Sequence, residues 1–176
     1  MTLELDDMDR ALLHDLQEDA RISNAELARR LGLSPTGLQK RIRKLEEAGV
    51  IAQYATLVKR EAVGFDMLCF VQVTLRRHEL DATARFKEQV RQMPEVLECH
   101  HLTGEYDYLL KVVVRNTRHL EQFLMETLTP VPSMDKIRTS VVLSEIKSTT
   151  MLPLTRPPNG TPGDSLRSEG KTDDEA

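Results

Sequence analysis

Residues 22–51 read ISNAELARRLGLSPTGLQKRIRKLEEAGVI, and this stretch decides the fold of the N-terminal part of the chain. Ser23 and Glu26 have the spacing of a capping box, which predicts a helix that begins near residue 24 and ends at Gly32. Ser34-Pro35 supplies an N-cap followed by proline at the first helical position, so the next helix should run from there to about residue 48. Two helices joined by a tight glycine turn are typical of a helix-turn-helix.

An earlier helix completes this unit. Between residues 6 and 17, apolar side chains recur at helical spacing: Met8, Leu12, Leu13 and Leu16. In the helix that begins near residue 24, we expect Ala25, Ala28 and Leu31 to face the shared core. The expected N-terminal unit is therefore a bundle of three short helices.

The last of these helices has an unusual exposed surface. At about 100° per residue, its buried edge holds Leu38, Ile42 and Leu45. No Asp or Glu occurs between Leu27 and Leu45, whereas six basic residues do: Arg29, Arg30, Lys40, Arg41, Arg43 and Lys44. A three-helix bundle without a DNA role would usually mix acidic residues into that face, so the pattern favours insertion into a major groove. The predicted DNA-binding residues are Ser34, Pro35, Thr36, Gln39, Lys40, Arg41, Arg43 and Lys44.

Composition bounds the remaining possibilities. A net charge of −4 argues against a protein that coats nucleic acid without specificity, although it allows a local basic patch. Two cysteines, Cys69 and Cys99, indicate reduced thiols and a cytoplasmic protein. We expect no membrane span, because no apolar run approaches the ~18 residues that a bilayer requires. The acidic N-terminus does not resemble a signal peptide.

After residue 64 the pattern changes to alternating strands and helices. We expect strands at residues 67–75, 96–103, 108–114 and 137–146, with helices at 81–93 and 120–128. Ala84, Phe86, Val90 and Met93 should anchor the first of these helices. The order β-α-β-β-α-β is that of a ferredoxin-like sandwich, in which two helices cover one face of the sheet. A partner subunit is the economical cover for the other face, and a two-fold dimer should recognise an inverted repeat.

The fold class is therefore α+β: a winged-helix-like helix-turn-helix followed by a ferredoxin-like sandwich. The expected domains are residues 1–52, a linker strand or hinge at 53–65, the second domain at 66–152 and a disordered tail at 153–176. The tail has almost no apolar residues and cannot bury enough surface to offset its chain entropy.

Three features together resemble one known family. They are the stretch at residues 22–51, the segment ECHHLTGEYDYLLKV at 98–112, and the β-α-β-β-α-β order. The chain resembles the leucine-responsive regulator/asparagine regulator (Lrp/AsnC) family over about residues 3–150. The resemblance implies a transcriptional regulator that binds promoter DNA, forms dimers and often octamers, and responds to a small effector, commonly an amino acid. It implies no cofactor.

The resemblance also assigns an effector site. By position, the implied effector-binding residues are Gly104, Glu105, Tyr106, Asp107, Tyr108, Thr117, Ser140 and Val141. The chemistry fits, since a glycine turn presents backbone amides to a carboxylate and a neighbouring Asp can receive an ammonium. Without the resemblance, the same segment would be interpreted as a hairpin turn with a solvated Asp.

The sequence contains features of two other functions, a metal site and an enzyme. Cys99, His100 and His101 are adjacent on a predicted strand and so point to alternate faces, which makes a metal site there unfavourable. Siroheme decarboxylases, which act in haem-precursor synthesis, resemble this family and share its two-module scaffold. An enzyme of this kind is the alternative function. An unbroken cationic helix has little use in such an enzyme, and we therefore expect no enzymatic activity.

Overall fold

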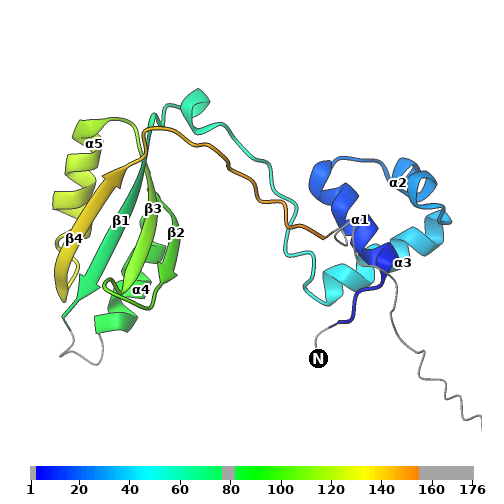
Figure 1. The fold of residues 1–176 in the computed structure, drawn as a ribbon, viewed down its shortest axis with the longest axis horizontal. Coiled ribbons are helices and arrows are strands. Elements are labelled where there is room, and N and C mark those ends of the chain that lie inside the picture. The colour runs from blue at the N-terminus through cyan, green and yellow to red at the C-terminus, as the bar shows by residue number, and fades with distance from the viewer. Residues whose placement is uncertain (1–2, 77–81, 155–176) are drawn as a thin grey trace, which may run out of the picture. The chain divides into compact units, whose positions relative to one another are not determined.

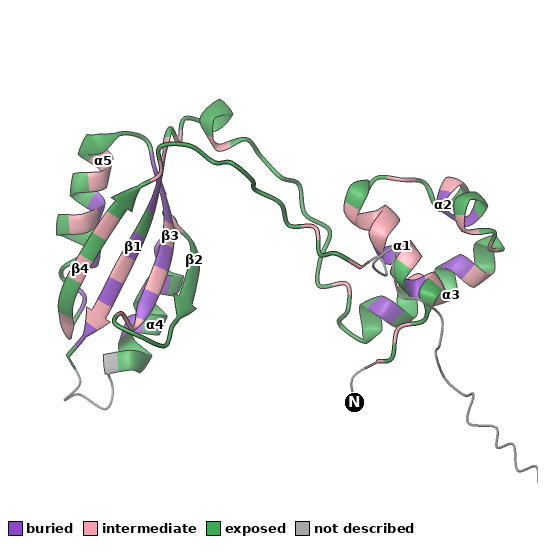
Figure 2. Ribbon diagram, in the orientation of Figure 1, coloured by how far each residue is buried: buried purple, intermediate pink, exposed green. Residues whose placement is uncertain are grey.

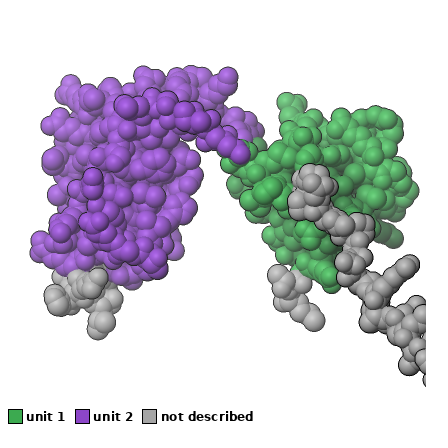
Figure 3. Space-filling view, viewed as in Figure 1, with its two compact units in different colours: residues 1–55, 149–176 green, residues 56–148 purple. Residues whose placement is uncertain are grey.

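The computed structural model describes residues 3–76 and 82–154, which fall into two compact units (Figure 3). One unit comprises Met1–Ala55 together with Thr149–Ala176, and the other comprises Thr56–Ser148. The residues after 148 thus group with the N-terminal unit, whereas the sequence placed residues up to 152 in the second domain. Most of the predicted tail lies outside the described residues.

Three helices form the first unit (Figure 1): α1 (Asp7–Glu18), α2 (Asn24–Leu31) and α3 (Pro35–Glu47). The predicted caps are confirmed, because the Ser23 hydroxyl accepts from the Glu26 amide and the Ser34 hydroxyl accepts from the Gly37 amide. Gly32 adopts φ 64°, the left-handed conformation that ends α2 with little strain. Local hydrogen bonds therefore position α2 and α3 for a tight turn.

The core of this unit differs in one respect from the expected core. Leu12, Leu27, Leu38 and Leu45 are fully buried at its centre. Ala25 is exposed, so its predicted core role is wrong, and Leu27 takes the inward position instead. The observed orientation of α2 buries Leu27 in place of Ala25, and leucine removes more apolar surface from water than alanine would.

The second unit carries the predicted β-α-β-β-α-β order. Its elements are β1 (Met67–Leu75), α4 (Ala82–Arg91), β2 (Val96–His101), β3 (Tyr108–Val114), α5 (Thr117–Gln122) with a π-helical continuation (Phe123–Leu128), and β4 (Met134–Val141). The four strands form one antiparallel sheet in the order β2-β3-β1-β4. The ferredoxin-like expectation is confirmed.

Helices α4 and α5 cover one face of the sheet, and the other face is open. Cys69, Val71 and Val73 point into the core beneath the helices, where they meet Phe86 and Phe123. From Cys69 onward, buried residues of β1 alternate with exposed or intermediate ones, and the latter lie on the open face (Figure 2). Phe70 is 37% exposed there. This face is apolar in part, and neither of the helices α4 and α5 covers it.

Several element boundaries differ from the expected ones. β4 ends at Val141 rather than at residue 146, because β1 begins at Met67 and offers no further partner beyond the bond from the Val142 amide to the Leu68 carbonyl. The helix expected from residue 120 begins at 117, where Asn116 caps it. Ala84 is exposed and does not anchor α4.

The segment that joins the units has no strand. Its regular element is a 3-10 turn (Arg60–Val63), tied to the sheet unit by the ion pair between Arg60 and Glu145 at 3.2 Å. Within residues 3–76 and 82–154, no helix is long and apolar enough to cross a bilayer.

Candidate nucleic-acid interface and ligand loop

Helix α3 presents a row of exposed polar side chains. The exposed members of the predicted set are Ser34, Pro35, Thr36, Gln39, Lys40, Arg43 and Lys44. Ser34 uses a lone pair of its hydroxyl for the cap at 3.1 Å, which leaves its proton free to donate to a phosphate. The N-terminal turn of α3 thus offers small donors, and its middle offers an amide and three cations.

The basic patch is smaller in space than in sequence. Glu26 holds both Arg29 and Arg30, at 2.7 Å and 2.9 Å. These two arginines lower the pKa of the Glu26 carboxyl to about 2, and the hydrogen bond from Arg29 is the largest cause. Within the described part of the chain, Lys40, Arg43 and Lys44 have no such carboxylate partner. Among the six basic residues of the predicted patch, those that the structure leaves without a carboxylate partner therefore all belong to α3.

Arg41 differs from the other cations of α3. It is only partly exposed, and one guanidinium nitrogen donates to Asp6 at 2.7 Å and to Asp9 at 2.6 Å. Both carboxylates belong to the first turn of α1. The sequence predicted Arg41 to be one of the DNA-binding cations, but in the structure it forms an intramolecular ion pair.

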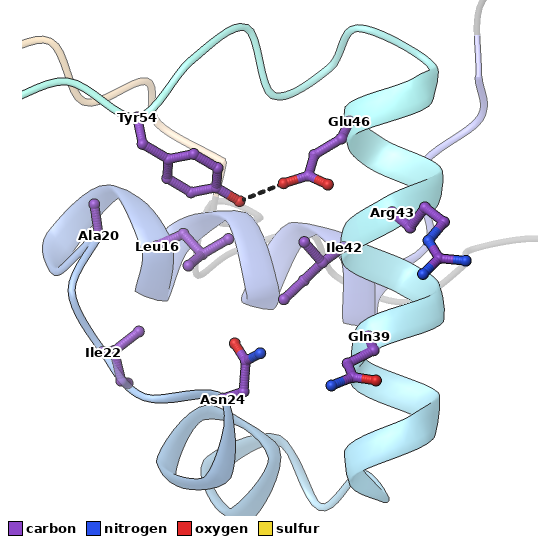
Figure 4. Close-up of a pocket in the computed structure, with 9 residues that line it drawn as sticks. All are labelled: Leu16, Ala20, Ile22, Asn24, Gln39, Ile42, Arg43, Glu46 and Tyr54. Atoms are coloured by element: carbon purple, nitrogen blue, oxygen red, sulfur yellow. Dashed lines mark hydrogen bonds between the residues drawn. The ribbon is translucent and has the colours of Figure 1, made fainter.

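A cleft of about 530 Å³ adjoins the exposed row (Figure 4). Leu16, Ile22 and Ile42 form its apolar floor, while Gln39 and Asn24 point into it. At its rim, the Tyr54 hydroxyl donates to the Glu46 carboxylate at 3.0 Å. The sequence did not single out either residue: Tyr54 lies after α3 in a segment without regular structure, and Asn24 was considered only as the start of a helix.

The loop between β2 and β3 is held by Asp107. Its carboxylate accepts from the Leu75 amide at 2.8 Å, and its own amide donates to the Val73 carbonyl at 3.0 Å. Gly104 adopts φ 125°, a conformation that side chains disfavour, so the turn depends on glycine there. Asp107 consequently has a structural role in addition to any contact with a ligand.

Three further residues of the loop have distinct environments. Glu105 is exposed, whereas Tyr108 is buried between the rings of Phe86 and His101. The Tyr106 hydroxyl accepts from Arg138 of β4 at 3.1 Å, and this contact raises the pKa of the guanidinium. Arg138 therefore belongs to the neighbourhood of the loop, although only the tertiary structure places it there.

The predicted effector residues form two separate groups. Tyr108 is aligned with Val73 of β1, but Val141 is aligned with Cys69 on the other side of that strand. Four residues along a strand correspond to about 13 Å, and the two intervening strand spacings add roughly 10 Å sideways. Ser140 and Thr117 lie with Val141, toward the opposite end of the sheet from the loop. One small ligand cannot contact both groups of the same subunit.

Comparison with known families matches both units. Residues 5–52 match the profile of the winged helix-turn-helix DNA-binding family, and residues 68–152 match that of the Lrp/AsnC ligand binding domain. The leucine-responsive regulatory protein of Escherichia coli strain K12 is 40% identical over 149 residues, which cover 85% of this chain and 91% of the relative.

Solved structures agree with these matches. A transcriptional regulator from Neisseria meningitidis, crystallised in complex with L-Met, superposes with a TM-score of 0.83 at 40% identity and covers 86% of this chain and 97% of its own. The feast or famine regulatory protein from Mycobacterium tuberculosis, complexed with L-methionine, gives 0.75 at 34% identity, with coverages of 85% and 99%. These relatives are regulators, so the comparisons support the regulatory function over the enzymatic alternative.

Proposed function

Because the chain belongs to the Lrp/AsnC family of DNA-binding transcriptional regulators, we propose that it binds inverted-repeat promoter sites through α3 and responds to an apolar amino acid such as methionine. The observation that carries the DNA part is the row of free cations around Gln39 on α3. The observation that supports the ligand part is the presence of L-methionine in two related structures. The protein would act in the cytoplasm, where promoter DNA is accessible.

The proposed division of labour on α3 follows from side-chain chemistry. Gln39 can pair with two atoms of an adenine edge, and Arg43 or Lys40 can donate to a guanine edge. Lys44 and the small donors Ser34 and Thr36 would contact phosphates, which position the helix without selecting a sequence. Pro35 stiffens the first turn beside them.

The proposed ligand site is shared between subunits. The loop group, Gly104–Tyr108, and the strand group with Thr117, Ser140 and Val141 lie too far apart to hold one amino acid within a subunit. Docking the loop of one subunit beside the strand group of another would bring them together. The second oxygen of Asp107 is the proposed partner for the ammonium, and the amides near Gly104 are the proposed partners for the carboxylate.

The open sheet face is the proposed dimer interface. Phe70 and Leu109 lie on it, and Ser140, aligned with Phe70 on the neighbouring strand, is the member of the strand group that shares this face. An apolar sheet face left in water is unfavourable, and a second copy is a self-complementary cover for it. Assembly beyond the dimer, for example an octamer, is part of the proposal because a ligand between dimers would then bias one assembly over another.

One experiment tests the combined proposal. Fluorescence anisotropy would follow binding to a labelled duplex obtained by binding-site selection, at several salt concentrations, with and without L-methionine. The proposal predicts steep salt dependence and a change of affinity with L-methionine. Binding without sequence preference, or affinity that no apolar amino acid alters, would overturn the corresponding half of it.

A further inference from the structure

Arg41 occupies the back of the recognition helix. At about 100° per residue, position 41 is separated by roughly 200° from positions 39 and 43, so its side chain leaves α3 opposite Gln39 and Arg43. It lies instead beside the buried edge formed by Leu38 and Leu45, and it extends to α1. A phosphate contact on the face of Gln39 is therefore a poor geometric match for this side chain.

The acceptors of Arg41 are themselves a local structural unit. Asp6 is the N-cap of α1, and its carboxylate accepts from the Asp9 amide at 2.6 Å. The Asp9 carboxylate accepts in return from the Asp6 amide at 3.3 Å, which completes a reciprocal capping box. Arg41 thus binds the same two carboxylates that begin α1.

Asp9 makes this contact costly to lose. Its side chain is 1% exposed, and among the residues that the structure describes no other charged side chain is buried. A carboxylate removed from water needs a charged partner, and Arg41, 32 residues away, supplies it. The pair therefore fixes one point of α3 against the start of α1.

We propose that Arg41 is a positioning residue for DNA recognition: it sets the rotation and height of α3 on the capping box of α1 and contacts no phosphate. This inference rests on the proposed role of α3 in DNA binding. With Arg41 in place, Gln39 and Arg43 are presented together to the groove. Without it, α3 can rotate about its own axis. The base contacts of Gln39 and Arg43, which need an exact orientation, are then lost before the phosphate contacts, which depend mainly on charge.

The salt dependence of binding separates positioning from phosphate contact. We would compare Arg41→Gln with Lys44→Gln, which also removes one positive charge of α3, on a selected duplex and on a random duplex. Arg41→Gln should lower the ratio of specific to random affinity by roughly tenfold, about the loss of one base contact, with an unchanged salt slope. Lys44→Gln should weaken both duplexes alike and reduce the slope by about one. A slope reduced by about one in Arg41→Gln would overturn the inference.

The acidic partners provide a test of opposite sign. If Arg41 contacted DNA, Asp6→Asn would release it and remove a negative charge, so DNA affinity should rise. A positioning role predicts that Asp6→Asn lowers specific affinity, as Arg41→Gln does, and that Arg41→Lys restores much of the specificity. A rise of specific affinity in Asp6→Asn contradicts the inference.

Folding and the proposed DNA surface need separate controls. Circular dichroism at the assay temperature selects folded variants, and the partly exposed Asp6 keeps the test available if Arg41→Gln does not fold. If Gln39→Ala and Lys44→Gln leave DNA binding unchanged, the proposed function of α3 is wrong. If those two behave as expected and Arg41→Gln resembles Lys44→Gln, only the inference about Arg41 is wrong.

Discussion

The side-chain amide of Gln17 makes two hydrogen bonds with the backbone of Leu152, 135 residues later in the chain. The Leu152 amide donates to Oε1 at 2.7 Å, and Nε2 donates to the Leu152 carbonyl at 3.2 Å. Leu154 packs against the core of the same helical unit. The chain thus returns from the last strand of the ligand-binding unit to α1, and the two units are joined by two covalent segments.

The first prediction concerns this returning segment. A chain that ends after Leu154 should be as stable as the full chain, but a chain that ends after Ser148 should be less stable in its helical unit, because both bonds to Gln17 are lost. Gln17→Ala should cost on the order of 1 kcal/mol of unfolding free energy, as expected for exposed hydrogen bonds. Urea unfolding followed by circular dichroism measures this, with the exposed neighbour Glu18→Ala as control. Equal stability of both truncated chains would mean that the segment does not dock in solution.

The second prediction concerns base recognition. Gln39→Ala and Arg43→Ala should each reduce discrimination at one position of the half-site by about 1–3 kcal/mol, because each removes hydrogen bonds to a base edge. Binding-site selection with each variant measures the change, and Glu47→Ala, exposed at the end of α3, is the control. A preferred motif that stays the same in both variants would show that other residues select the sequence.

The third prediction concerns stability at acid pH. The folded pKa of Glu26, about 2, lies below its ordinary value of 4.5 because Arg29 and Arg30 bind the carboxylate. The unfolded chain therefore takes up the proton first, so this stabilisation is complete above about pH 4.5 and is lost as the pH falls toward 2.

Glu26→Gln should accordingly flatten the fall of unfolding free energy between about pH 5 and pH 2. Denaturant unfolding across this range measures the slope, and Glu47→Gln, exposed on α3, should leave it unchanged. Parallel curves for the wild type and Glu26→Gln would contradict the role of the two arginines.

The fourth prediction concerns Asp107. Since its carboxylate also accepts from the Leu75 amide, Asp107→Ala removes a structural contact as well as a charge. Asp107→Asn retains an acceptor for that amide and removes the charge, so it should fold normally and lose stabilisation by L-methionine. Thermal shift with the twenty amino acids measures this, with Glu105→Gln in the same loop for comparison. Equal stabilisation of the wild type and Asp107→Asn would place the ammonium partner elsewhere.

The fifth prediction concerns the open sheet face. Phe70→Glu should convert the dimer to a monomer, because it places a charge in the middle of the proposed interface. Met125→Glu, on the helical side and 65% exposed, should leave the assembly intact. Multi-angle light scattering distinguishes the two results. A dimer that persists in Phe70→Glu would require a different interface.

The sequence alone determined the features that depend on neighbours a few residues apart. Ser23, Gly32 and Ser34 bound α2 and α3 as expected, because caps and left-handed turns use hydrogen bonds within about four residues. The strand expected at residues 67–75 likewise has these bounds in the structure. Together with the resemblance, these local signals were enough to predict the fold class and the family.

Only the tertiary structure decided the contacts between distant segments. It directed Arg41 to Asp6 and Asp9, joined Gln17 to Leu152, and ended β4 where β1 offers no partner. It also separated the effector residues into two groups. No local periodicity encodes these outcomes, because a charge or an amide can satisfy its hydrogen bonds with any acceptor that packing brings near, and packing depends on the whole chain at once.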